Sequence, residues 1–116
     1  MGTDFIHLLV LLVFGHMLAD YPLQGDFLAK AKNRHNPVPG VPWYWAMGAH
    51  TTIHAGFVFI ITGSAALAVA ELLIHWLVDD YKCAGWLSFD ADQFIHLFCK
   101  AGWAAMATLM AYGVAA

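Results

Sequence analysis

Four apolar segments dominate the sequence, and they restrict its possible folds more than any other feature. They cover roughly residues 3–20, 46–62, 64–81 and 91–114, and each approaches the ~20 residues that a helix needs to cross a bilayer. Hydrophobic residues make up 61% of the chain and charged residues only 11%, against about 25% charged residues in soluble domains. The 116 residues therefore predict a single transmembrane domain, an all-α, antiparallel four-helix bundle.

The connections between the segments set the order of the helices. Gly63 can end one helix and Ser64 can cap the next, so the second and third helices should form a tight hairpin. The 21–45 connection contains all four prolines and should be a real loop, with room for a short amphipathic helix over 26–32. A second, shorter loop is expected over 82–91.

The charges of these loops predict an orientation in the membrane. Helices that alternate in direction put both loops on one side and both termini on the other. Lys30, Lys32, Arg34 and Lys82 all lie on the loop side, so the positive-inside rule makes the loops cytoplasmic and both termini external. We therefore expect a multi-pass protein of the cytoplasmic membrane, with the lipid bilayer as its partner. The net charge of −3 and the lack of a basic stripe argue against nucleic acid as a partner, and the oligomeric state stays open.

Ionisable residues recur at one spacing inside the apolar segments. Each segment contains one pair of His or Asp residues four positions apart, whereas random placement would give roughly one or two pairs in all. The pairs are His16 and Asp20, His50 and His54, His75 and Asp79, and Asp92 and His96. At this spacing the two side chains share one face of a helix.

The four pairs should also lie at the same depth in the bundle. Counted from the hairpin, His54 lies ~14 Å and His75 ~17 Å along the helix axes. The expected arrangement has two tiers, an inner one of histidines and an outer one nearer the cytoplasm. The inner tier is His16, His54, His75 and His96, and the outer tier is Asp20, His50, Asp79 and Asp92.

Carboxylates and imidazoles are costly inside a bilayer, and divalent cations would stabilise them. The mixed ligand set favours zinc, with iron or manganese as alternatives. Four-helix bundles build two-metal sites from inward-facing ligands, and eight ligands would suit two ions better than one. Asp20, Asp79 and Asp92, next to the loops, are the candidates for catalysis. A hydrogen-bonded polar core and a proton path are the alternatives to a metal.

Four further residues are expected to support this site. Glu71 precedes His75 by one turn and Lys100 follows His96 by one turn, so they should form an ion pair in which Glu71 orients a histidine. Gln24 and Lys32 follow the first helix and should lie at the rim of the site.

The stretch HMLADYPLQGDFLAKAK, residues 16–32, resembles the opening motif of the family described as domain of unknown function 3307. The matching residues are His16, Asp20, Tyr21, Leu23, Gln24 and Lys32. The later stretches HTTIH, HWLVDDYK and DQFIH also resemble blocks of that family, whose members are small membrane proteins of bacteria and phages. The resemblance implies a multi-span membrane protein and supplies no activity.

Two classes of function fit the sequence. In the first, metal activates water to hydrolyse lipid or isoprenoid headgroups, and basic loop residues attract a phosphate. In the second, the protein binds or transports a metal ion or protons without catalysis. Beyond Glu71 and Lys100 the helices are apolar, which disfavours a path through the membrane. Haem is a third possibility, but it would leave the partners four residues away unexplained.

Overall fold

The computed structural model describes residues 4–115, and within this range it contains five helices and no strand. The helices are α1 (Phe5–Asp20), α2 (Gly25–Ala31), α3 (Trp43–Thr62), α4 (Ala65–Cys83) and α5 (Phe89–Ala115). The all-α prediction is confirmed, whereas the predicted start of the first helix at residue 3 lies outside the described residues.

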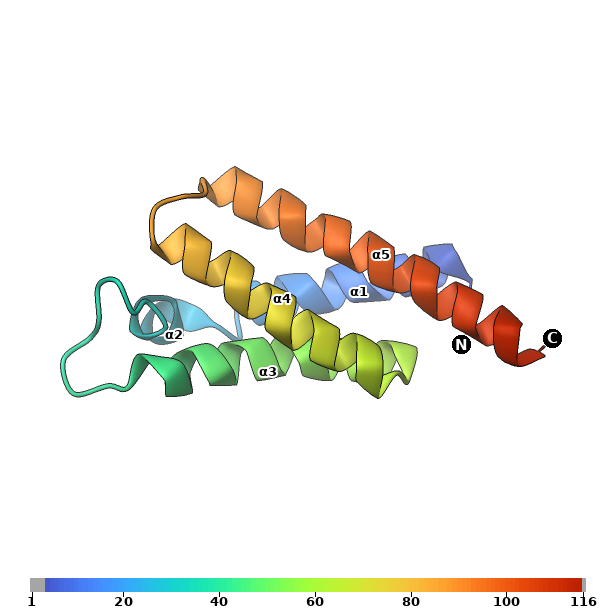
Figure 1. Cartoon of the computed structure of the whole chain (residues 1–116), viewed down its shortest axis with the longest axis horizontal. Helices are drawn as coiled ribbons and strands as arrows, with labels where there is room; N and C mark the ends of the chain where they lie inside the picture. Colours follow the sequence, from blue (N-terminus) through green and yellow to red (C-terminus); the bar gives the residue numbers. More distant parts are fainter. Residues whose placement is uncertain (1–3, 116) are drawn as a thin grey trace.

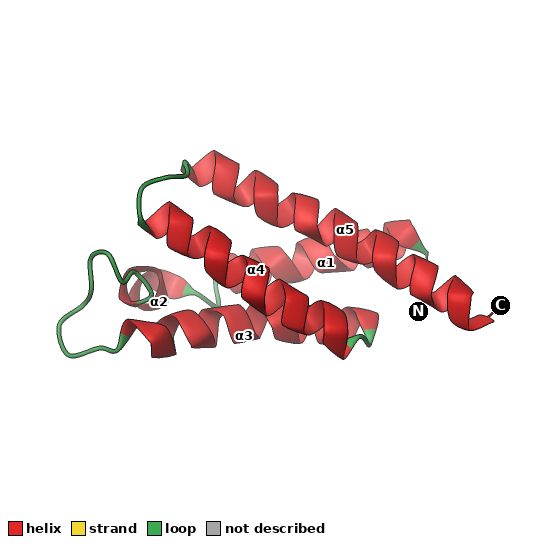
Figure 2. Ribbon diagram, viewed as in Figure 1, coloured by secondary structure: helices red, strands yellow, loops and turns green. Residues whose placement is uncertain are grey.

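The four long helices form an elongated bundle of 53 × 24 × 21 Å (Figure 1). α3 and α4 lie side by side as a hairpin, and α1 packs against both α3 and α5. The α4–α5 connection and the loop before α3 lie at one end of the bundle (Figure 2). The start of α1 and the end of α5 lie toward the other end, where the α3–α4 turn is also found.

The tight turn between α3 and α4 confirms the prediction made from Gly63 and Ser64. Gly63 ends α3 in the left-handed conformation, with φ of 72°, and its N–H donates to Phe59 O at 2.7 Å. Ser64 caps α4, because its hydroxyl oxygen accepts from Leu67 N at 3.1 Å. These caps allow two antiparallel helices to follow each other with almost no loop.

The segment predicted as a loop over 21–45 contains the short helix expected over 26–32, which the structure places at Gly25–Ala31. A sharp corner of 82° separates α1 from the short helix α2, which packs against α3. Gly25 permits this corner, since its φ of 64° is favourable for glycine and costly for other residues. Beyond α2, Arg34 donates to both oxygens of Asp80 at 2.8 and 2.9 Å, and this carboxylate raises the pKa of the Arg34 guanidinium.

Side-chain polarity in the bundle is reversed from that of a soluble protein. Large apolar side chains point outward at four-residue intervals. Examples are Ile6, Val10 and Phe14 on α1, Val69, Leu73 and Leu77 on α4, and Phe94 and Phe98 on α5. Histidines, carboxylates and lysines are instead buried between the helices. A cluster of buried apolar side chains lies toward the turn between α3 and α4, formed by Leu8, Leu12, Val58, Leu67, Trp103, Ala104 and Ala107.

By length and apolarity, one of the described helices could cross a membrane alone, namely α5 over Phe89–Ala111. α1 and α2 meet the same criterion only when counted as one bent pair. α1 is only 16 residues long, and α3 and α4 contain the polar groups of the site. The expectation of four spanning helices is therefore not confirmed by this criterion.

Candidate metal centre

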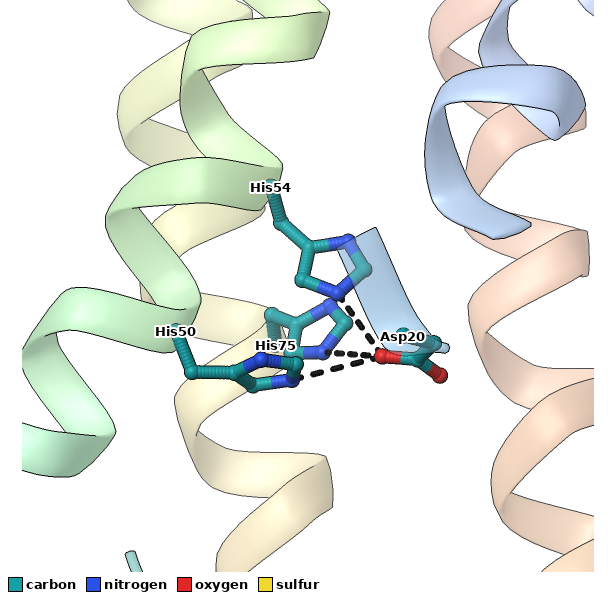
Figure 3. A group of neighbouring side chains, drawn as sticks. All are labelled: Asp20, His50, His54 and His75. Carbon is teal, nitrogen blue, oxygen red and sulfur yellow. Dashed lines mark hydrogen bonds and ion pairs between the residues drawn. The ribbon is translucent and has the colours of Figure 1, made fainter. Parts of the chain in front are cut away.

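Asp20 at the end of α1 lies at the centre of a group of three histidines. His50 and His54 come from α3, and His75 comes from α4 (Figure 3). All three Nε2 atoms face the same carboxylate oxygen, Oδ1 of Asp20 (Figure 3). The distances from Oδ1 are 2.8 Å for His54, 3.3 Å for His50 and 3.8 Å for His75.

These distances suit a shared cation. Ligand atoms about 2.1 Å from a tetrahedral ion lie about 3.4 Å apart, and the three distances fall on both sides of that value. Only His54 donates a hydrogen bond to Oδ1. The buried Nε2 atoms of His50 and His75 have no hydrogen-bond partner among residues 4–115, although Nε2 of His50 also lies 3.2 Å from Oδ2 of Asp79. Such orphaned buried atoms are rare in folded proteins and call for an explanation. Asp20, His50, His54 and His75 could hold a metal ion.

A second group of possible ligands overlaps the first. It consists of His75, Asp79 and His96. Oδ1 of Asp79 lies 2.9 Å from Nε2 of His96 and 3.5 Å from Nε2 of His75. Because the same nitrogen of His75 takes part in both groups, His75 can serve only one ion at a time.

The balance of charge distinguishes Asp20 from the other buried carboxylates of the site. Three carboxylates each have a lysine as a partner: Asp79 with Lys32, Asp92 with Lys82, and Glu71 with Lys100. Among the described residues, no lysine or arginine lies within ion-pair distance of Asp20, whose carboxylate is in hydrogen-bond or ion-pair contact with histidines and Gln93. Asp20 is therefore the one carboxylate of these four that has no lysine or arginine partner among the described residues.

Gln93 of α5 is a site residue that the sequence reasoning missed. Its Nε2 donates to Oδ2 of Asp20 at 2.7 Å, and its Oε1 accepts from Nε2 of His16 at 3.0 Å. It thereby orients the central carboxylate. Gln93 lies three residues before His96 and therefore on the same face of the helix, which could have identified it. A search restricted to His and Asp does not find it.

The eight predicted ligands are not arranged in two separate tiers. Asp20 and His50, expected in the outer tier, lie among the inner histidines His54 and His75. His16 lies outside both ligand groups because its Nε2 is directed at Gln93. Asp92 also lies outside them. It sits between Lys82, at 3.7 Å, and Nε2 of His96, at 3.2 Å.

The structure places Glu71 and Lys100 in direct contact, buried between α4 and α5. Oε1 of Glu71 also lies 3.4 Å from Nδ1 of His75, and Oε2 accepts from Trp103 Nε1 at 2.9 Å. Of the three histidines around Asp20, only His75 therefore has a partner for its second nitrogen among the described residues.

The sequence suggested that Lys32 lies at the rim of the site, but the structure does not place it there. Its side chain is buried, and its ammonium donates to Oδ2 of Asp79 at 2.6 Å and to Oε1 of Gln24 at 2.5 Å. The corner between α1 and α2 turns this residue back into the bundle. Gln24 is half-buried and also donates to the backbone oxygen of Asp20 at 3.0 Å.

A hollow of about 260 Å³ reaches the site at this corner. Its walls are Asp20, Tyr21, Gln24, Gly25, Asp26, Ala29 and Phe89. Asp20 thus faces the histidines on one side and the hollow on the other. Water and small solutes can approach the central carboxylate from this end of the bundle.

The fold and the site describe a helical bundle with a buried His/Asp cluster that could hold a metal ion. The family described as Protein of unknown function (DUF3307) matches residues 8–112, so the chain belongs to this family. The resemblance seen in the sequence is confirmed. No curated protein and no solved structure matches the chain.

Proposed function

We propose that the protein binds one divalent cation, preferably zinc, through Asp20, His50, His54 and His75. The single observation that carries the proposal is the position of Asp20. It has no lysine or arginine partner among the described residues, and three imidazole nitrogens converge on its Oδ1. Three nitrogens and one oxygen are a ligand set typical of zinc, while iron and manganese accept the same donors. A bound cation would neutralise the carboxylate and give the orphaned nitrogens a partner.

We also propose that the bundle lies in a membrane, with the metal site near the cytoplasmic face. The outward apolar side chains and the buried polar ones are the arrangement expected for helices surrounded by lipid. The loop before α3 contributes Arg34, and Lys82 lies in the last turn of α4, both at the same end of the bundle as the end of α1. The positive-inside rule then makes this end cytoplasmic and the opposite end external.

A hydrolytic role is the second step of the proposal. The hollow beside Asp20 offers room for water and for part of a substrate, as a catalytic site requires and a closed structural site does not. A divalent cation at this place would supply a Lewis acid and an activated water for attack on a lipid or isoprenoid headgroup. Asp20, Asp79 and Asp92 are the carboxylates available to accept a proton.

Transport of a metal ion or of protons is less well supported. Toward the α3–α4 turn the interior between the helices is filled by the apolar core around Leu12, Val58 and Trp103. The buried ion pair nearest to this core among the described residues is Glu71 with Lys100. A conducting path would need polar groups or water across this core.

Metal content tests the proposal directly. The full chain, purified in detergent and dialysed against zinc and then against metal-free buffer, should retain one equivalent of zinc by elemental analysis. His54→Ala should lose most of it, since the variant removes the nitrogen nearest to Asp20. His7→Ala is the matched control, because His7 is exposed and contacts only Asp4 among the residues described.

Full zinc content in His54→Ala, or a wild-type chain that retains none, would reject the metal site. Hydrolysis is tested separately by incubating the zinc-loaded chain with mixed phospholipids and isoprenoid phosphates and measuring released phosphate or headgroup. A folded, metal-loaded chain that releases neither, but moves zinc or protons across liposomes, would favour transport.

A further inference from the structure

The ammonium of Lys32 contacts Asp79, the carboxylate of the second group of possible metal ligands. Lys32 is 5% exposed. It directly follows α2, which packs against α3 (Figure 1). Its contacts with Asp79 and Gln24 are both within 2.6 Å. Lysine is rarely buried to this degree unless its charge is paired, so the environment is built to hold a cation.

The partner of Lys32 is also the central carboxylate of the second ligand group. Oδ2 of Asp79 accepts from the ammonium, while Oδ1 faces Nε2 of His75 and of His96. A metal ion on Oδ1 would therefore share its only carboxylate with a fixed positive charge. Like charges around one carboxylate repel each other strongly in a site of low polarity.

The ligands themselves are sufficient for two ions. One ion could be held by Asp20, His50 and His54, and another by His75, Asp79 and His96. Each ion would then have three protein ligands, one of which is a carboxylate. Two-metal sites in proteins are built from such closely spaced sets. What distinguishes the two halves is charge, because Asp79 has a lysine partner and Asp20 has none.

We infer that Lys32 is an internal counter-ion that limits the centre to one metal ion by neutralising Asp79. This inference rests on the proposed metal binding and goes one step beyond it. Gln24 accepts a hydrogen bond from the ammonium and fixes its position. The 82° corner between α1 and α2 brings Lys32 close to Asp79. Removal of the positive charge leaves Asp79 in the same condition as Asp20, a buried carboxylate facing imidazole nitrogens.

The test is the zinc stoichiometry of the purified full chain in detergent. Lys32→Met keeps most of the side-chain volume and removes the charge, so it should raise the content from one to two zinc ions per chain. Lys32→Gln should do the same with a polar side chain. Asp79→Asn added to Lys32→Met should remove the second ion, since it removes the carboxylate that attracts it.

Lys30→Met is the matched control, because Lys30 lies on the same short helix and is exposed. It should leave the content at one ion. A Lys32→Met chain that folds only when zinc is supplied also supports the inference, since zinc then replaces the ammonium.

Two results would overturn the inference. One is a folded Lys32→Met or Lys32→Gln chain that still binds a single ion, and the other is a failure of both variants to fold at any zinc concentration. A wild-type chain without zinc would instead reject the proposed function itself, so the two failures are distinguishable.

Discussion

Oε1 of Glu71 lies 3.4 Å from Nδ1 of His75, one turn away on the same helix. His75 is the histidine that belongs to both possible ligand groups. A carboxylate behind a metal-binding imidazole fixes the ring and directs the lone pair of its other nitrogen toward the metal. Glu71 is in turn held by Lys100 and Trp103, so the orientation of one ligand depends on a buried network in the middle of the bundle.

Glu71→Gln should weaken zinc binding by roughly 10- to 100-fold, the usual effect of removing such a supporting group. The variant also leaves the ammonium of Lys100 buried without its partner, which should cost roughly 3 to 5 kcal/mol of stability. Glu71→Gln combined with Lys100→Met should recover much of that stability while zinc binding stays weak. Zinc titration and thermal unfolding of the three chains measure the two effects separately, and recovery of full affinity in the double variant would contradict the role given to Glu71.

Asp20→Asn should weaken both metal binding and the metal-free fold. Zinc affinity should fall by at least roughly 10- to 100-fold, because the loss of a ligand is no milder than the loss of a supporting group. The metal-free chain should lose roughly 1 to 3 kcal/mol of stability, because the amide replaces one of the two oxygens that accept from His54 and Gln93 and leaves a buried donor without an acceptor. Unfolding with and without zinc checks both changes, and full zinc affinity in the variant would contradict the role of Asp20 as a ligand.

Gly15→Val should disturb the contact between α1 and α3. A Cβ at this position would lie 3.1 Å from Cβ of Phe57, so a branched side chain would push the helices apart at a cost of roughly 1 to 3 kcal/mol. Because Asp20 lies farther along the same helix, zinc affinity should fall as well. Gly102→Ala is the control, since a Cβ there meets nothing within 4 Å, and alanine in a helix should be neutral or stabilising by about 0.5 to 1 kcal/mol.

Thiol labelling of intact cells tests the proposed orientation in the membrane. In a chain with Cys83→Ser and Cys99→Ala, a cysteine placed by Asn36→Cys should be protected from an impermeant reagent, and one placed by Ala66→Cys should react. Both positions are exposed. They are better probes than Cys83, whose thiol pKa is raised by burial and which therefore reacts slowly. The opposite labelling pattern would invert the predicted topology.

The sequence predicted the helical fold and the hairpin because both follow from local rules. The caps at Gly63 and Ser64 act within a few residues of each other. The four-residue spacing likewise predicted that side chains from different helices would face a common interior, and it identified Asp20, His50, His54 and His75.

Features that depend on how the helices cross could not be predicted in this way. Counting residues along the helix axes treats them as parallel and level, and this produced the two tiers that the structure mixes around Asp20. The burial of Lys32 depends on the 82° corner after α1, which no spacing reveals. The polar groups that build the site also lower the hydropathy of α3 and α4, so neither helix meets the apolarity criterion for a membrane span.

The corner between α1 and α2 has a consequence for how the two ligand groups come to differ. The four long helices hold all the candidate ligands, whereas Lys32 directly follows the short helix α2. If Lys32 limits the centre to one ion, as we infer, the choice between two neighbouring sites depends on the placement of a helix of seven residues that carries none of the ligands.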